Sequence, residues 1–128
     1  PINGAEQFCI ALAIGKTDAP VRQNETEFKR KPLSAVCSEE NKVAQAVRLA
    51  PSSLNSQPWR IELGNEKVLI KDAGRGFSRL ILKKKLNKID IGIAARHAVL
   101  ALEHQGKEIE AVIPKTENDS FYIEILYQ

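Results

Sequence analysis

The chain has 128 residues, enough for one domain with a modest core, and we expect a single domain spanning residues 1–128. Hydrophobic residues make up 43% of the chain and charged residues 27%, as in ordinary globular proteins, and no apolar run is long enough to span a bilayer. The formal net charge of +3 is a weak basic balance that is compatible with an anionic ligand and gives no specific sign of nucleic-acid binding.

The cysteine and methionine contents bear on the compartment and on the extent of the chain. Cys9 and Cys37 lie far apart without metal-type spacing, so we expect reduced thiols in a cytoplasmic protein, although a fold that brought them together would allow pairing. The sequence contains no signal peptide. It also contains no methionine, so we expect the chain to be a piece of a longer protein.

The first part of the chain predicts a strand, a connector and a helix. Residues 8–14 form a compact apolar run that predicts a buried strand, and the polar residues 16–31 predict a surface connector. Ser38, followed by two glutamates, predicts the N-cap of a helix with apolar residues at helical spacing. That helix must end at or before Ala50, because Pro51 disfavours a helical residue before it.

Alternation of apolar and polar residues predicts strands at residues 59–63, 68–70, 108–113 and 121–127. Gly64 and Asn65 indicate a hairpin turn between the first two strands, and residues 114–120 predict a polar loop between the last two. The strand at residues 121–127 is rich in apolar residues, and as a free edge it would favour pairing with another chain.

The most apolar helix is predicted at residues 91–105, with Asp90 as its N-cap and Gly106 at its C′ position. A separate short basic helix is predicted at residues 78–87. The 91–105 segment is apolar on nearly every side, so we expect it in the core, with Leu100 fully buried. The expected fold is therefore α+β, with a mostly antiparallel sheet packed with helices around this buried central helix.

The segment Ala-Pro-Ser-Ser-Leu-Asn-Ser-Gln-Pro-Trp at residues 50–59 carries the strongest functional signal. Its prolines and small hydroxyl residues cannot continue a helix and leave backbone groups without helical partners. The hydroxyls of Ser52 and Ser53 and the carboxamides of Asn55 and Gln57 add hydrogen-bonding groups, which suits a polar, partly aromatic ligand. The alternative is a rigid corner between a helix and a strand.

The other polar candidates favour structural roles. His97 and His104 lie seven residues apart on one helix without a completed set of metal ligands, so we expect His97 to be structural and predict no metal site. The step from Gly74 to Gly76 lacks a third glycine for a dinucleotide fingerprint, and the lysine run at 83–85 is typical of a solvated face. No serine, cysteine or carboxylate has an evident partner base, so we predict no catalytic side chain.

Two segments carry a resemblance to a known family. Ala-Pro-Ser-Ser-Leu-Asn-Ser-Gln-Pro-Trp-Arg at residues 50–60 resembles the flavin-contacting turn of the FMN-dependent nitroreductases. Residues 89–106, which begin Ile-Asp-Ile-Gly-Ile-Ala, resemble the long central helix of a subgroup in which one polypeptide carries two nitroreductase-like halves. Gly15, followed by the Lys-Arg-Lys-Pro-Leu segment at 29–33, is similar to the junction between these halves. The resemblance implies that this chain is the second half and the C-terminal part of the longer protein.

The resemblance implies a flavoprotein that takes hydride from NADH or NADPH through FMN and reduces a small nitro or quinone-like acceptor. The implied cofactor contacts are Pro51, Ser52, Ser53, Asn55 and Gln57. The implied partner is a second copy or the missing N-terminal half, with no nucleic acid and no membrane.

The chain departs from the family pattern because no arginine-serine-x-arginine segment is present to hold the FMN phosphate. The basic candidates for that role are Arg75 and the run at residues 79–88. The alternative function is a non-catalytic, nitroreductase-like module that has lost flavin binding and serves in assembly.

Overall fold

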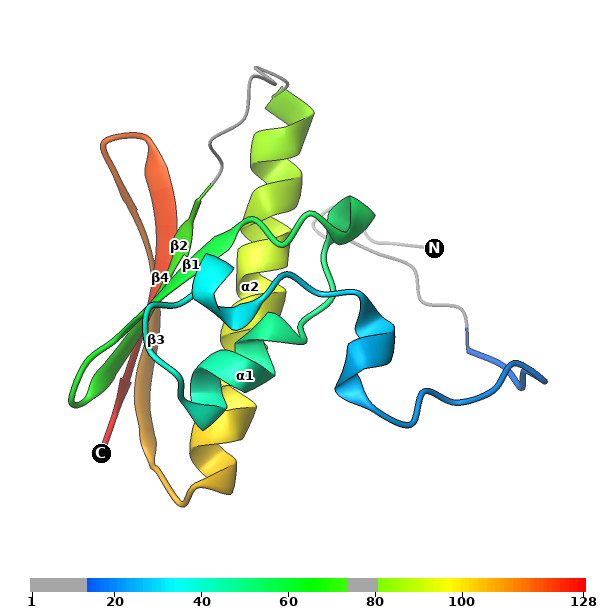
Figure 1. The fold of residues 1–128 in the computed structure, drawn as a ribbon. Coiled ribbons are helices and arrows are strands. Elements are labelled where there is room, and N and C mark those ends of the chain that lie inside the picture. Colours follow the sequence, from blue (N-terminus) through cyan, green and yellow to red (C-terminus); the bar gives the residue numbers. More distant parts are fainter. Residues whose placement is uncertain (1–13, 74–80) are drawn as a thin grey trace, which may run out of the picture.

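The computed structural model describes residues 14–73 and 81–128, and it shows a four-stranded antiparallel sheet with helices on one side (Figure 1). The strand order is β1-β2-β4-β3, with the bounds β1 (Trp59–Leu63), β2 (Lys67–Asp72), β3 (Ile109–Glu117) and β4 (Ser120–Tyr127). The helices of the described ranges are α1 (Lys42–Arg48), α2 (Ile81–His104) and the short 3-10 helices η1 (Glu25–Phe28), η2 (Leu33–Ala35) and η3 (Ser53–Asn55). This architecture is the predicted α+β class.

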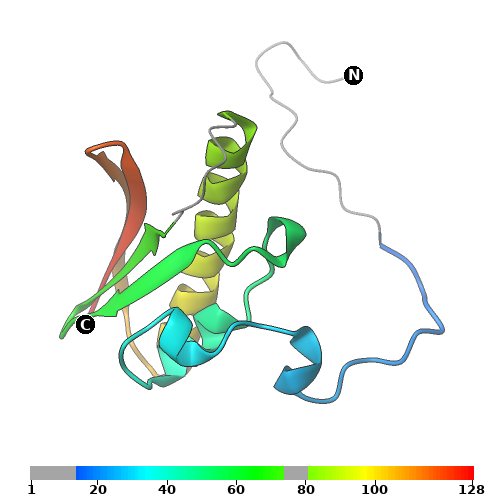
Figure 2. The same ribbon diagram turned by 45° about the horizontal axis from the view of Figure 1, so that its top comes forward.

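The core lies between the sheet and the two α-helices. Helix α2 packs against β2 and β4, and α1 packs against α2 (Figures 1 and 2). Alternate strand residues point toward α2, and each fully buried aliphatic side chain among them contributes about 1.5–3 kcal/mol of transfer free energy. The largest fully buried side chains are those of Trp59, Ile70, Ile91, Ile125, Val36, Val47 and Val68.

Helix α1 begins later than predicted. Ser38 is not its N-cap, because Asn41 takes that position and its side chain accepts a hydrogen bond from the Val43 N–H at 2.6 Å. Cys37 forms a parallel bridge with Ile61, which keeps the chain extended just before this cap. The predicted end of the helix is confirmed, since Leu49 is the C-cap, two residues before Pro51.

The two helices predicted at residues 78–87 and 91–105 are one continuous helix in the described structure, α2. Asp90 is therefore not an N-cap, because no proline or glycine interrupts the helix just before it, and its buried carboxylate contacts η3 instead. The C-terminal end is confirmed: Gly106 adopts a φ of 76°, and the Lys107 N–H donates to the Leu102 carbonyl at 3.0 Å, as in a Schellman motif.

The prediction that α2 is buried on every side is wrong at Leu100, which is 48% exposed, and at Ile89, which is 50% exposed. The buried residues of α2 recur at helical spacing on one face, which packs on the sheet and on α1. Leu100 lies at the edge of this face and is about half exposed to solvent.

The hairpin at residues 59–70 is confirmed, with the Gly64 N–H donating to the Lys67 carbonyl at 2.8 Å. The loop predicted at residues 114–120 is wrong, because β3 continues to Glu117 and only Asn118 and Asp119 form the turn, both with positive φ. Two left-handed residues match a tight hairpin turn of the I′ kind. Pro114 is tolerated inside β3 because β3 is an edge strand.

The strand at residues 121–127 is not a free edge of the sheet. Strand β4 lies between β2 and β3 and is paired on both sides. The strand predicted at residues 8–14 lies almost wholly outside the described residues, and the one described member, Ile14, is not in a strand. Cys9 and the segment from Gly74 to Gly76 also lie outside the described residues.

Candidate functional site

The candidate site is the turn at residues 51–57, which contains η3 and connects α1 to β1. Figures 1 and 2 show η3 beside α2, on the side away from β3 and β4. The turn brings all five predicted contact residues into one short segment. Pro51 and Asn55 are exposed there, Ser52 and Ser53 are half-buried, and Gln57 is buried.

The turn has an unusual backbone. Leu54, Asn55 and Gln57 have φ values of 52°, 54° and 45°, which place three non-glycine residues in the left-handed region. Such a conformation costs on the order of 1–3 kcal/mol per residue and persists only where surrounding contacts hold it. Leu54 is also 99% exposed, so this backbone presents an apolar side chain to solvent.

Three hydrogen bonds fix the turn from the inside. The Ser53 N–H donates to Oδ1 of Asp90 on α2 at 2.9 Å, and the Gln57 N–H donates to the Ser52 hydroxyl at 2.8 Å. The Asn55 N–H also donates to the Ser52 carbonyl at 3.0 Å. Ser52 and Ser53 therefore shape the turn through their own backbone and hydroxyl groups.

A basic segment at residues 29–31, which we call the basic clip, holds the turn from the outside. Arg30 Nη1 donates to Asn55 Oδ1 at 2.6 Å, and the Lys31 N–H donates to Gln57 Oε1 at 2.7 Å. Asn55 Nδ2 in turn donates to the Lys29 carbonyl at 3.1 Å. The predicted surface connector at residues 16–31 does lie at the surface, and its C-terminal end also makes these contacts with the turn.

The basic clip creates an excess of positive charge beside the turn. Arg30 makes no ion pair within the described residues, and its pKa is lowered by burial first and then by the charges of Arg22 and Arg48. The guanidinium carbons of Arg22 and Arg30 lie 4.8 Å and 5.6 Å from the centre of the Phe28 ring. Of Arg22, Arg30 and Arg48, only Arg48 has a carboxylate partner within the described residues, Glu25 at 3.2 Å.

Sequence reasoning missed these cations. It named Arg75 and the run at 79–88 as basic candidates, but Arg75 and Arg79 lie outside the described residues. The available signal was the Lys-Arg-Lys-Pro run at residues 29–32, because a cationic run ended by proline can form an extended strap.

Asp90 is the buried acid of the site. It is 3% exposed, its Oδ1 accepts from the Ser53 N–H, and its Oδ2 makes no hydrogen bond with any described residue. Burial raises the pKa of Asp90, the Ser53 hydrogen bond opposes that rise, and the charge of Asp72 adds to it. Asp90 therefore attaches η3 to α2 through its hydrogen bond with Ser53.

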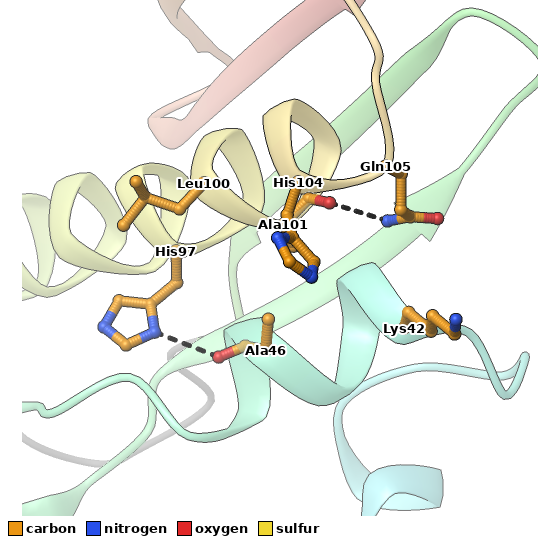
Figure 3. A pocket seen from close by; sticks show the side chains of 7 residues that line it. All are labelled: Lys42, Ala46, His97, Leu100, Ala101, His104 and Gln105. Carbon is orange, nitrogen blue, oxygen red and sulfur yellow. Dashed lines mark hydrogen bonds between the residues drawn. The ribbon is translucent and has the colours of Figure 1, made fainter.

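A hollow with a volume of about 320 Å³ lies between α1 and α2, apart from the turn (Figure 3). His97 Nδ1 lies 3.1 Å from the Ala46 carbonyl, which is the hydrogen-bonded role predicted for a structural histidine. Leu100 and His104 line the same hollow. Among residues 14–73 and 81–128, no three or more His, Cys, Asp or Glu side chains gather in a way that would hold a metal ion.

Neither α-helix within the described ranges combines the length and apolarity needed to cross a membrane. No curated protein matches the chain in sequence. The structure resembles a putative nitroreductase from Thermotoga maritima MSB8, with a TM-score of 0.55 and 22% sequence identity. The similarity covers 87% of this chain and 45% of that protein, so the chain spans less than half of the length of its relative. Residues 1–102 match the family described as Putative TM nitroreductase, and the chain therefore belongs to that nitroreductase-like family.

Proposed function

We propose that the protein is an FMN-dependent NAD(P)H oxidoreductase of nitroreductase type and that this chain supplies one wall of the flavin site. The observation that carries the proposal is the turn at residues 51–57, whose strained backbone is held by Asp90 and by the basic clip. Strained backbone maintained by surrounding contacts is concentrated at ligand-binding and active sites.

The residues of the turn fit a flavin in their chemistry. Pro51 and Leu54 offer exposed apolar surface to a planar ring, and the Asn55 carboxamide keeps one amide hydrogen that no described residue accepts. The phosphate of FMN carries close to two negative charges, and the net positive charge of the basic clip would attract it toward the turn without a direct contact from Arg30. Ser52, Ser53 and Gln57 would hold the turn in shape and present its polar groups.

When bound, FMN would accept hydride from NADH or NADPH and pass electrons to a nitro or quinone-like acceptor. The protein's part would be to bind the cofactor, to orient it and to limit access of water. Within the described residues, no acid or base needs to act on the substrate in this scheme. Asp90 does not reach solvent and serves to hold Ser53.

The exposed face of α2 supports the proposal that a second body completes the site. The residues of this face follow one another at spacings of four and three, as at a helix-pairing seam. They are Ile89, Arg96, Leu100 and Glu103, which are exposed, and Ile93, which is half-buried. Arg96 and Glu103 stand on either side of Leu100, 3.8 Å apart between their charged groups, so an antiparallel copy of this helix would meet opposite charges. We propose that a second copy of the chain, or the N-terminal half of the longer protein, covers this face.

The test is to purify the protein, add FMN, and measure molecular mass and bound flavin by gel filtration with light scattering. We expect flavin to be retained only in the species that contains the second body, together with NAD(P)H-dependent reduction of a nitrofuran or a benzoquinone. Leu100→Glu should reduce both association and flavin retention. Val112→Glu is the matched control, because Val112 is also 48% exposed but lies on β3.

The alternative function is a non-catalytic module that serves in assembly. It is favoured by the use of Ser52, Asn55 and Gln57 in hydrogen bonds within the chain. An associated form that binds no FMN and reduces no acceptor would support this alternative and exclude the oxidoreductase. A monomer that retains stoichiometric FMN would contradict the requirement for a second body.

A further inference from the structure

The guanidinium of Arg30 joins three separate parts of the chain. Its Nε and Nη2 donate to the Leu49 carbonyl at 3.2 Å and 3.1 Å, where α1 ends. Its Nη1 donates to the Phe28 carbonyl at 3.2 Å and to Asn55 Oδ1 at 2.6 Å. All three nitrogens of the group are therefore directed at oxygen atoms of the protein.

Asn55 is the point at which this network meets the strained backbone. Its Oδ1 accepts from Arg30 and, at 3.2 Å, from Gln57 Nε2, while its Nδ2 donates to the Lys29 carbonyl. Asn55 has a φ of 54°, and the preceding Leu54 has a φ of 52°. The Asn55 side chain therefore ties two consecutive left-handed residues to the basic clip.

Lys31 adds a second attachment in the same direction. Its Nζ donates to the carbonyls of Ser56 at 2.7 Å and Gln57 at 3.0 Å, so these two carbonyls have a protein partner. A lysine ammonium is a flexible point charge, whereas the guanidinium is a planar fork with fixed donor directions. Arg30 is therefore the member of the basic clip that can define a single orientation of the turn.

We propose that Arg30 is a positioning residue, which holds residues 53–57 in their binding conformation through Asn55 and does not itself contact the ligand. The identity of the ligand rests on the proposed function, but the positioning role belongs to the ligand-free protein. The two can therefore be tested separately.

The first experiment measures hydrogen exchange of the ligand-free protein. The Asn55 and Ser56 N–H groups report on the turn, since they donate to the carbonyls of Ser52 and Ser53 at 3.0 Å. Loss of a hydrogen bond to a charged group should speed their exchange about ten-fold or more in Arg30→Ala, with a smaller effect in Arg30→Lys. The Gly64 N–H in the β1–β2 hairpin is the internal reference and should be unchanged.

The matched control is Arg22→Ala. Arg22 lies over the same Phe28 ring and adds the same charge to the cluster, but its side chain makes no hydrogen bond to residues 51–57 in the described structure. It should leave exchange at Asn55 and Ser56 unchanged. If Arg30→Ala does not fold, hydrogen exchange of the turn is measured in Arg30→Lys and Asn55→Ala instead. Unchanged exchange of the turn in folded Arg30 variants would overturn the proposal.

The second experiment is a double-mutant cycle with FMN as the probe. Arg30→Ala and Asn55→Ala should each weaken FMN binding several-fold, and the double variant should be little weaker than either one, because both changes release the same support. The positioning role would be overturned if the two single variants lowered FMN affinity by factors that multiply in the double variant while hydrogen exchange of the ligand-free turn stayed unchanged. That result would show that Arg30 contacts the ligand directly. If the unmodified protein binds no FMN, the proposed function fails, and the exchange measurement still decides the role of Arg30.

Discussion

Two leucines of α2 provide a sharp test of where the core ends. Leu102 is 3% exposed and Leu100 is 48% exposed, although they are two residues apart on the same helix. Replacing each with alanine removes the same atoms and leaves a residue of high helix propensity. The difference between the two variants therefore reports mainly on burial.

The expected magnitudes follow from these exposures. Leu102→Ala should cost about 2–5 kcal/mol in the free energy of unfolding, since it removes buried carbons and leaves a cavity. Leu→Ala removes three carbons, worth about 2.4 kcal/mol at roughly 0.8 kcal/mol each when fully buried. With about half of the Leu100 side chain in water, Leu100→Ala should cost about 1 kcal/mol and leave no closed cavity.

The assay is urea unfolding followed by Trp59 fluorescence, at two protein concentrations that differ widely. At low concentration we expect the large and small losses given above, with equal slopes against urea. Equal losses for both variants at low concentration would refute the assignment of Leu100 to the surface. A loss at Leu100 that grows with protein concentration would instead report burial of this residue by a second copy.

Two further predictions concern Asp90 and Gly106. Because burial raises the pKa of Asp90, the folded state holds this proton more tightly than the unfolded state, and stability should fall as pH rises from the usual aspartate range through the raised pKa. In unfolding curves measured across acidic pH, Asp90→Asn should remove the part of the stability loss that comes from Asp90. Glu39→Gln, at an exposed site, should leave the pH dependence of stability unchanged. The same pH dependence in Asp90→Asn as in the unmodified protein would contradict the role of burial. Gly106→Ala should cost about 1–2 kcal/mol in thermal unfolding, because Gly106 has a φ of 76° and no atom close enough to a new Cβ to compensate. Gly92→Ala, within α2, has open space and a helical backbone, so it should be neutral or stabilising, and a loss equal to that of Gly106→Ala would refute the backbone argument.

The parts of the fold that depend on local chemistry could be predicted from the sequence. The β1–β2 hairpin follows from alternation and a glycine turn, and Gly106 ends α2 because a left-handed C′ residue needs no Cβ. The turn at residues 51–57 also follows from local signals, because Pro51 ends a helix and Pro58 precedes a strand.

The errors occurred where a residue's partner lies far away in the sequence. Asp90 has the residue type of an N-cap, but its carboxylate is held by Ser53, which lies 37 residues earlier. Arg30 contacts Asn55 across 25 residues, and no local pattern specifies that contact. The exposure of Leu100 depends on where α1 packs along α2, which helical spacing alone does not define.

The position of β4 in the sheet has a consequence for the order of folding. The β3–β4 hairpin is local in sequence and closes through the two-residue turn at Asn118 and Asp119. The β2–β4 pairing joins Lys67 to Leu126, so it must close a long loop that contains all of α2. Closing such a loop costs chain entropy before the contacts form, so we expect docking of the preformed β3–β4 hairpin onto β2 to limit the folding rate. During synthesis, the edge of β2 that pairs with β4 therefore stays unpaired until residues 120–127 have emerged from the ribosome.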